Sequence, residues 1–159
     1  MKHTAAGKWL KIVVIFVGMC GLLVYGWGLP NIFAVICKAY PQFTSWRTPW
    51  LTFLWVTAIP CYGVLVCTWK IARNIGRGAA FSYDNGNQLK RIARFAAADA
   101  AFLFVGNIVF GICGMNRVAM ACASLVVVTL GVAIAVCAKA MAQLVYQAAD
   151  IQEENNGTI

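Results

Sequence analysis

Acidic side chains are scarce in this sequence, and histidine is almost absent. His3 is the single histidine, and the carboxylate side chains are only Asp84, Asp99, Asp150, Glu153 and Glu154. The helix motif of zinc proteases and the Gly-x-Ser-x-Gly elbow of serine hydrolases are both missing. No pair of catalytic acids can be placed in the apolar segments that dominate the chain. We therefore expect a protein without enzymatic activity.

Closely spaced cysteine pairs are missing as well, although the chain has seven cysteines. A structural zinc site needs four converging ligands, usually in paired spacing, and no Cys-x-x-Cys occurs here. Buried cysteine commonly behaves as a small hydrophobic residue, so we expect no bound metal and no cofactor. A disulfide between Cys37 and Cys113 stays open, because both lie in or beside segments expected at the outer face of a membrane.

Charge is scarce overall, and long apolar runs take its place. Hydrophobic residues make up 62% of the chain, charged residues 11%, and the mean hydropathy is +0.75. Four charge-poor runs cover residues 12–29, 48–69, 100–116 and 118–138. Each is close to the roughly 20 residues that a helix needs to cross about 30 Å of hydrocarbon. The lipid bilayer is therefore the expected environment.

These runs predict the whole domain organisation. We expect one all-α transmembrane domain over residues 1–159, an antiparallel bundle of four helices. Its spans should lie near residues 9–29, 49–70, 95–114 and 118–139. A loop over residues 71–94 should join the second span to the third, and good helix-forming sequence should continue the fourth span into a helical tail over residues 140–159.

Basic residues predict how this bundle is oriented. An even number of spans places ten of them on one side: Lys2, Lys8, Lys11, Lys70, Arg73, Arg77, Lys90, Arg91, Arg94 and Lys139. The other side carries only Lys38, Arg47 and Arg117. The positive-inside rule then predicts that both termini and the 71–94 loop lie in the cytoplasm. Because membrane orientation explains the net charge of +8, we expect no direct nucleic-acid binding.

Proline marks the expected boundaries of the first two helices. The first helix should end at residues 28–30, Gly-Leu-Pro, which leaves residues 30–48 as an aromatic outer loop on the membrane surface or over the mouth of the bundle. Thr48 should cap the second helix, whose first position suits Pro49. Pro60 should kink this helix in the middle of the membrane.

Glycine and capping residues mark the boundaries that follow. Gly76 and Gly78 should end the second helix, and Ser82 or Asp84 should cap the third. A Gly-x-Gly beside an arginine could suggest a phosphate-binding loop, but the preceding strand and the following lysine are missing, so we expect a plain turn. The turn over residues 114–117 is short enough to require an antiparallel hairpin into the fourth helix.

Asp99 is the one carboxylate inside a predicted span. Such a group must face the bundle interior, meet water or find a cation. Lys139 is expected at similar depth, and Asn107 lies nearer the middle of the membrane, where its amide can bond across helices. Two interpretations stay open. Asp99 either handles protons or ions in a small transporter or channel component, or it forms a structural ion pair, which its shallow position favours.

The middle loop and the C-terminal tail carry a family resemblance. Residues 75–93 read Ile-Gly-Arg-Gly-Ala-Ala-Phe-Ser-Tyr-Asp-Asn-Gly-Asn-Gln-Leu-Lys-Arg-Ile-Ala, and residues 153–159 read Glu-Glu-Asn-Asn-Gly-Thr-Ile. They resemble the Arg-Gly-x-x-Phe-Ser-x-x-Asn segment and the closing tail of the YoaS-like family of small bacterial membrane proteins, domain of unknown function 2975. Asn156 and Gly157 replace the more usual aspartate and leucine. The candidate motif residues are Gly76, Arg77, Gly78, Phe81, Ser82, Asn85, Glu154, Asn155, Thr158 and Ile159.

The resemblance implies a protein of the bacterial cell membrane, with no activity established for the family. Its members are often encoded beside a small helix-turn-helix regulator, which implies a membrane partner that sequesters or signals to a cytoplasmic DNA-binding protein. Phe81 would either plug the base of the bundle or offer a docking knob, and we favour the plug because exposed loop phenylalanines are usually covered. The acidic residues of the tail could lie against Arg73, Arg77 or Arg91. Alanines spaced four apart permit close helix contact, and a homo-oligomer stays open.

Overall fold

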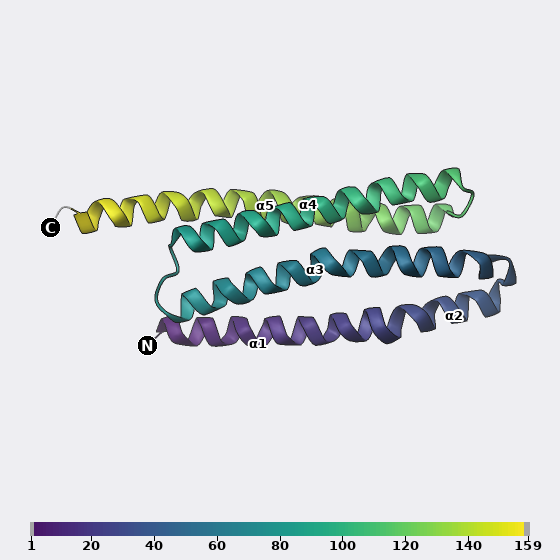
Figure 1. Cartoon of the computed structure of the whole chain (residues 1–159), viewed down its shortest axis with the longest axis horizontal. Helices are drawn as coiled ribbons and strands as arrows, with labels where there is room; N and C mark the ends of the chain where they lie inside the picture. Colours follow the sequence, from purple (N-terminus) through teal and green to yellow (C-terminus); the bar gives the residue numbers. More distant parts are fainter. Residues whose placement is uncertain (1, 158–159) are drawn as a thin grey trace.

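Long helices make up nearly all of the chain in the computed structural model, which describes residues 2–157 (Figure 1). The elements in chain order are α1 (Lys2–Leu23), a π-helical turn η1 (Val24–Gly28), α2 (Leu29–Ala39), a 3-10 helix η2 (Pro41–Trp46), α3 (Arg47–Gly76), α4 (Tyr83–Ile112) and α5 (Val118–Gly157). No strand occurs within residues 2–157. The predicted all-α class is confirmed.

Four continuous helical segments are long and apolar enough to cross a membrane. They cover Ala5–Ala39, Pro41–Gly76, Tyr83–Ile112 and Val118–Asn155. In the most apolar window of each segment, only 6% to 17% of the residues are buried inside the molecule. In water this packing would leave a larger exposed apolar surface than soluble proteins have. Lipid tails are as apolar as these side chains and can cover that surface. The chain is therefore a multi-pass helical membrane protein.

The helices form an open row. Extensive contacts join α1 to α3, α3 to α4, and α4 to α5, and Figure 1 shows the purple α1 and the yellow half of α5 on opposite sides of the row. At one end of the molecule, taken along the helix axes, lie the start of α1, the α3–α4 connection and the C-terminal half of α5. We call it the basic end, because most of the basic residues listed above lie there, and the opposite end holds the α2–α3 and α4–α5 connections.

The first helix does not end at residues 28–30, so that prediction is wrong. The chain passes through η1 into α2 and stays helical to Ala39. In the wide turn the Leu29 N–H donates to the Val24 carbonyl, and Pro30 has no N–H to offer the next carbonyl, that of Tyr25. The indole Nε1 of Trp55 donates to that carbonyl over 3.0 Å. A side chain of α3 thus stabilises the helix across its proline.

The start of α3 also differs from expectation. The helix begins at Arg47, with Trp46 at the N-cap and no capping side-chain hydrogen bond. Thr48 therefore lies inside the first turn and is not the cap. The preceding 3-10 helix η2 already gives the chain helical direction here. Pro60 lies within α3, as predicted, and Thr57 donates to the Leu54 carbonyl over 2.7 Å in the turn before it.

The predicted boundaries at the basic end are confirmed. α3 ends at Gly76, and Gly78 has φ +81°, a left-handed conformation that favours glycine after a helix. The Ser82 hydroxyl caps α4 by accepting from the Asn85 N–H over 3.4 Å. The α4–α5 hairpin and the continuous helix from the fourth span into the tail are also present. How deep each helix sits in the bilayer stays a prediction.

Candidate functional site

Asn85 is the centre of the turn that joins α3 to α4. Its side chain is 1% exposed and donates to the carbonyls of Ala79 and Ala80 over 3.1 and 2.9 Å. Its amide oxygen accepts from Asn74 of α3 over 2.8 Å. One buried amide therefore satisfies two carbonyls of the connection and ties it to both helices. This arrangement explains why an asparagine ends the Phe-Ser-x-x-Asn segment.

Asp84 strengthens the same turn from the solvent side. It is exposed, and it accepts from Asn74 over 2.7 Å and from Gln88 over 3.4 Å. Lys90, Arg91 and Arg94 follow in the next turns of α4, so this part of the helix belongs outside the hydrocarbon. The hydrogen bond from Asn74 lowers the pKa of Asp84 below its ordinary value. The turn is thus held by a charged carboxylate as well as by neutral amides.

Two tyrosines fasten this turn to the C-terminal half of α5. The Tyr83 hydroxyl donates to Asp150 and lies 3.3 Å from Glu153, and Tyr146 donates to Asn87 over 2.8 Å. The bond to Asp150 is the main reason that the pKa of Tyr83 rises to about 12. The two rings lie 6.2 Å apart, centroid to centroid. The motif turn and the tail therefore form one connected surface.

Gly86 permits the close approach of α5. A Cβ atom at this position would lie 2.5 Å from Cε1 of Tyr146, a distance that real side chains do not tolerate. Gly7 of α1 has a similar role, since a Cβ atom there would lie 2.8 Å from the backbone of Gly76 on α3, whereas a Cβ atom at Gly76 itself would meet nothing within 4 Å. Sequence reasoning used Gly76 only as a helix end and did not use Gly86, whose role depends on a residue 60 positions away.

The remaining motif residues lie on the surface. Arg77, Asn155 and Glu154 are exposed, and Phe81 is 59% exposed. Phe81 does not plug the base of the bundle, so the favoured prediction is wrong: the amide of Asn85 already fills the inside of the turn, and the ring is left outside. Thr158 and Ile159 lie outside the described residues. Asp150 and Glu153 meet Tyr83 rather than an arginine.

Asp99 lies in a second polar cluster, between α3, α4 and η1. Its Oδ2 is 3.9 Å from the sulfur of Cys61, which is also 3.9 Å from the Tyr25 hydroxyl, and that hydroxyl is 3.1 Å from Thr57. The Oδ1 atom of Asp99 is buried without a hydrogen-bond partner. The π-helical turn and the part of α3 that contains Pro60 meet at this cluster. Sequence reasoning found Asp99 but missed Tyr25 and Cys61.

The structure does not bring the three predicted intramembrane residues together. Lys139 lines a groove between α4 and α5 with Lys90 and Arg94. Asn107 bonds within its own helix to the Leu103 carbonyl over 2.9 Å, and it accepts from Asn116 of the α4–α5 turn over 3.1 Å. Asp99 therefore forms no ion pair with Lys139. Asn107 stabilises the α4–α5 hairpin and does not bond across the bundle.

No group of three or more histidine, cysteine or carboxylate side chains could hold a metal ion within the residues that the structure describes. All seven cysteines are free thiols, including Cys37 and Cys113. Six of these cysteines lie on α1, α2, α3 and α5, and Cys113 lies at the C-cap of α4.

Comparison with known proteins places this multi-pass helical membrane protein in a family. A family model described as "Protein of unknown function (DUF2975)" matches residues 31–159, and the chain belongs to that family. The uncharacterized membrane protein YoaS of Bacillus subtilis (strain 168) is 27% identical over 152 residues, which cover 94% of this chain and 95% of the relative. No solved structure matches. The resemblance identified from the motif and the tail is confirmed.

Proposed function

We propose that the chain is a non-enzymatic regulatory membrane protein, and that its basic end binds a small cytoplasmic DNA-binding regulator. The observation that carries the proposal is an ordered, exposed recognition surface at that end. We call it the motif surface and define it by Phe81, Tyr83, Asp150 and Glu153. Tyr83 of α4 is hydrogen bonded to both acidic residues of α5, and Phe81 lies two residues before Tyr83 in the α3–α4 connection.

The motif surface has the chemistry of a docking site. Phe81 offers a 59% exposed aromatic ring beside a turn whose backbone is held by the buried Asn85. Exposed aromatic residues on a rigid support are common centres of protein interfaces. Asp150 and Glu153 are two acidic residues within this otherwise basic end, and they offer a local contact for basic side chains of a DNA-binding protein. The C-terminal turns of α5 also project past the α3–α4 connection, where a soluble partner can reach them (Figure 1).

The direct test is co-purification from the bacterium that encodes the chain. Tagged full-length protein is extracted in mild detergent beside a Phe81→Ser variant and a form truncated after Ala149. A matched control is Tyr40→Ser, which removes an equally exposed aromatic residue, 54% against 59%, at the opposite end. We expect a small basic DNA-binding protein with the wild type and with the control, and its loss from both altered forms.

The proposal fails if no DNA-binding protein is retained by the wild type, or if the Phe81→Ser and truncated proteins retain it as well as the control does. Far-UV circular dichroism of each purified protein checks that the helices are intact. Loss of helicity in the truncated form would leave Phe81→Ser as the deciding variant, because an exposed ring has no part in helix packing.

A second candidate function is a small transporter or channel component that uses Asp99. It is favoured by the Tyr25–Thr57–Cys61–Asp99 cluster and by the unpartnered buried Oδ1 atom, since polar residues within spans often mark proton or ion pathways. Proteoliposomes with a pH-sensitive dye would show flux with the wild type and none with Asp99→Asn. Asp84→Asn is the matched control, a carboxylate outside the hydrocarbon. Absence of flux from the wild type excludes this function.

A further inference from the structure

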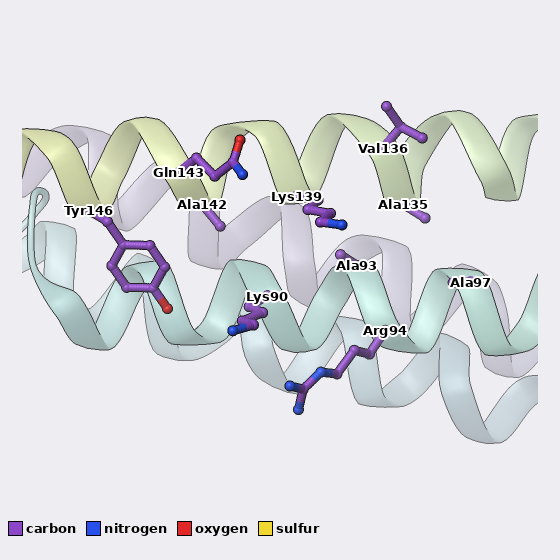
Figure 2. A pocket seen from close by; sticks show the side chains of 10 residues that line it. All are labelled: Lys90, Ala93, Arg94, Ala97, Ala135, Val136, Lys139, Ala142, Gln143 and Tyr146. Carbon is purple, nitrogen blue, oxygen red and sulfur yellow. The ribbon is translucent and has the colours of Figure 1, made fainter.

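A groove between α4 and α5 at the basic end combines positive charge with small side chains. Its cavity has a volume of about 450 Å³ and is lined by three basic residues, Lys90, Arg94 and Lys139. Ala93, Ala97, Ala135 and Ala142 form its floor and sides, with Tyr146 at one end (Figure 2). Alanine leaves room between two helices that pack closely elsewhere, and the groove is therefore open to a ligand.

Within the described residues, Asp84, Asp99, Asp150 and Glu153 all have their contacts away from these three cations. Asp84 bonds to Asn74 and Gln88 around the turn, and Asp99 faces Cys61 of α3. The carboxylates of Asp150 and Glu153 are both at Tyr83. Three like charges placed together repel one another, and an anion in the groove relieves that repulsion.

Figure 2 shows how the side chains are placed. Lys139 reaches from α5 toward α4, and Lys90 lies on α4 between Lys139 and Tyr146. The guanidinium of Arg94 is drawn on the side of α4 away from α5. Arg94 also lines a second basic cavity of about 490 Å³ with Lys70 and Arg91, on the α3 side. Lys139 therefore points across the groove from α5, and Lys90 and Arg94 line its α4 side.

An apolar cavity continues the groove along the helices. This cavity of about 380 Å³ shares Ala97, Ala135 and Val136 with the basic groove and runs on to Phe104 of α4 and Val128 of α5. Every side chain that lines this cavity is apolar, and the one charged residue on the stretch, Asp99, lies against Cys61 of α3 instead, so the cavity suits lipid tails. A positively charged entrance followed by an apolar channel matches a phosphate group attached to a hydrocarbon chain.

We propose that this groove binds an anionic membrane phospholipid. The ammonium groups of Lys90 and Lys139 hold the phosphate, Arg94 adds positive charge at the edge of the groove, and one acyl chain lies along the alanine-lined channel. Basic pockets between spanning helices are the common form of anionic-lipid sites. Charge complementarity points to an anionic lipid, and the attached apolar channel points to a lipid and not to a free phosphate. The inference does not depend on the proposed regulatory function.

The headgroup is tested by native mass spectrometry of the full-length protein. The protein is incubated with equal amounts of phosphatidylglycerol and phosphatidylcholine with the same acyl chains. We expect a preference for phosphatidylglycerol that falls roughly 30-fold in the variant Lys90→Gln/Lys139→Gln, about fivefold for each charge removed. The control Lys8→Gln/Arg73→Gln removes two exposed charges from α1 and α3 at the same end and should keep the preference.

The acyl channel is tested with variants that fill it. Ala135→Leu puts a larger side chain where the two cavities join, and Ala133→Leu, two residues away on exposed surface, is its control. We expect Ala135→Leu to lose retained phosphatidylglycerol and Ala133→Leu to keep it. Glycerol phosphate, which lacks acyl chains, should not displace the lipid.

Three results would overturn the proposal. The first is an equal loss of preference in the Lys8→Gln/Arg73→Gln control, which would mean general attraction to a basic surface. The second is full retention of the lipid by Lys90→Gln/Lys139→Gln. The third is displacement by glycerol phosphate at concentrations near that of the lipid, which would make the site one for a free phosphate. Circular dichroism of every variant checks that the helices are intact.

Discussion

Neighbouring helices are joined by different interactions at the two ends of the molecule. At the basic end, buried amide groups and tyrosine hydroxyls join α3, α4 and α5, with Asn85 1% exposed at the centre. At the opposite end, aromatic rings join α3 to α4: Trp50 is 3% exposed and stacks on Phe110, with 4.5 Å between the ring centroids. Hydrogen bonds have direction and fix one geometry, whereas stacked rings pack well in several.

The basic end is therefore held in one defined geometry, whereas the opposite end is held mainly by the packing of large side chains. The opposite end carries large rings on α3 and α4 together with Arg117 over the ring of Phe43 at 5.2 Å, and it resembles the aromatic belt at a membrane interface. The basic end holds an exposed motif in one position. A partner that must recognise a surface needs such a fixed geometry, and this is why we place the regulatory function at the basic end.

Trp50→Ala should have the largest effect on stability. The change removes the ring stack and the hydrogen bond from Nε1 to the Met115 carbonyl, 2.9 Å long, and we expect the free energy of unfolding to fall by about 3–5 kcal/mol. Unfolding in mixed micelles of increasing dodecyl sulfate, followed by circular dichroism, measures it. Trp27→Ala, at a 73% exposed tryptophan, is the control, and an equal loss there would contradict the assigned role of Trp50.

Asn85→Ala should come next, at the other end. It removes the acceptor of Asn74 and leaves the carbonyls of Ala79 and Ala80 without a partner, so we expect a loss of about 2–3 kcal/mol in the same assay. Asn31→Ala is matched to it, because the amide of Asn31 bonds only to the Trp27 carbonyl one turn back. If both variants unfold alike, the basic end is not held by Asn85.

Gly86→Ala should destabilise the contact between α4 and α5 by roughly 1–3 kcal/mol, since the added methyl group meets the ring of Tyr146. The double variant Gly86→Ala/Tyr146→Ala sharpens the test: without the ring, the alanine at position 86 should cost nothing further. Gly111→Ala has no atom within 4 Å of the added group and is the control. Additive losses in the double variant would show that the ring is not the cause.

Tyr83 should give the smallest effect, visible only in alkali. Its pKa is raised to about 12 from an ordinary 10.0, so its bond to Asp150 stabilises the tail below pH 10 and is lost as the pH rises through about 12. Tyrosinate absorbance that develops near pH 12 should disappear in Tyr83→Phe. In Asp150→Asn that absorbance should develop at lower pH. An unchanged curve in both variants would contradict the bond.

Local sequence predicted the elements well where the determining groups are neighbours. The four apolar helices, the end of α3 at Gly76, the Ser82 cap and the hairpin into α5 are all present. The family assignment was equally accessible, because its motif lies within one turn and one tail. Each of these features depends on residues a few positions apart, or on composition summed over a span.

The failures share a different cause. The first helix continues past Pro30 because Trp55, on the next helix, satisfies the carbonyl that the proline leaves free. Phe81 is exposed because Asn85 and Asn74, on two helices, fill the turn from inside. Asp99 meets Cys61 and not Lys139 because it lies on the face of α4 turned to α3. In each case the deciding partner comes from another helix, which local patterns do not reveal.

The membrane class and the number of spanning segments follow from the sequence alone, since hydropathy over about 20 residues decides whether a segment enters lipid. The sequence also predicted an orientation through the distribution of lysine and arginine. Only the tertiary structure decided which polar groups meet within the row, and it alone brought Lys90, Arg94 and Lys139 into one groove. The physical reason is that apolar composition fixes where a helix lies in a bilayer, whereas the angle at which each helix faces its neighbours depends on side-chain packing across the chain.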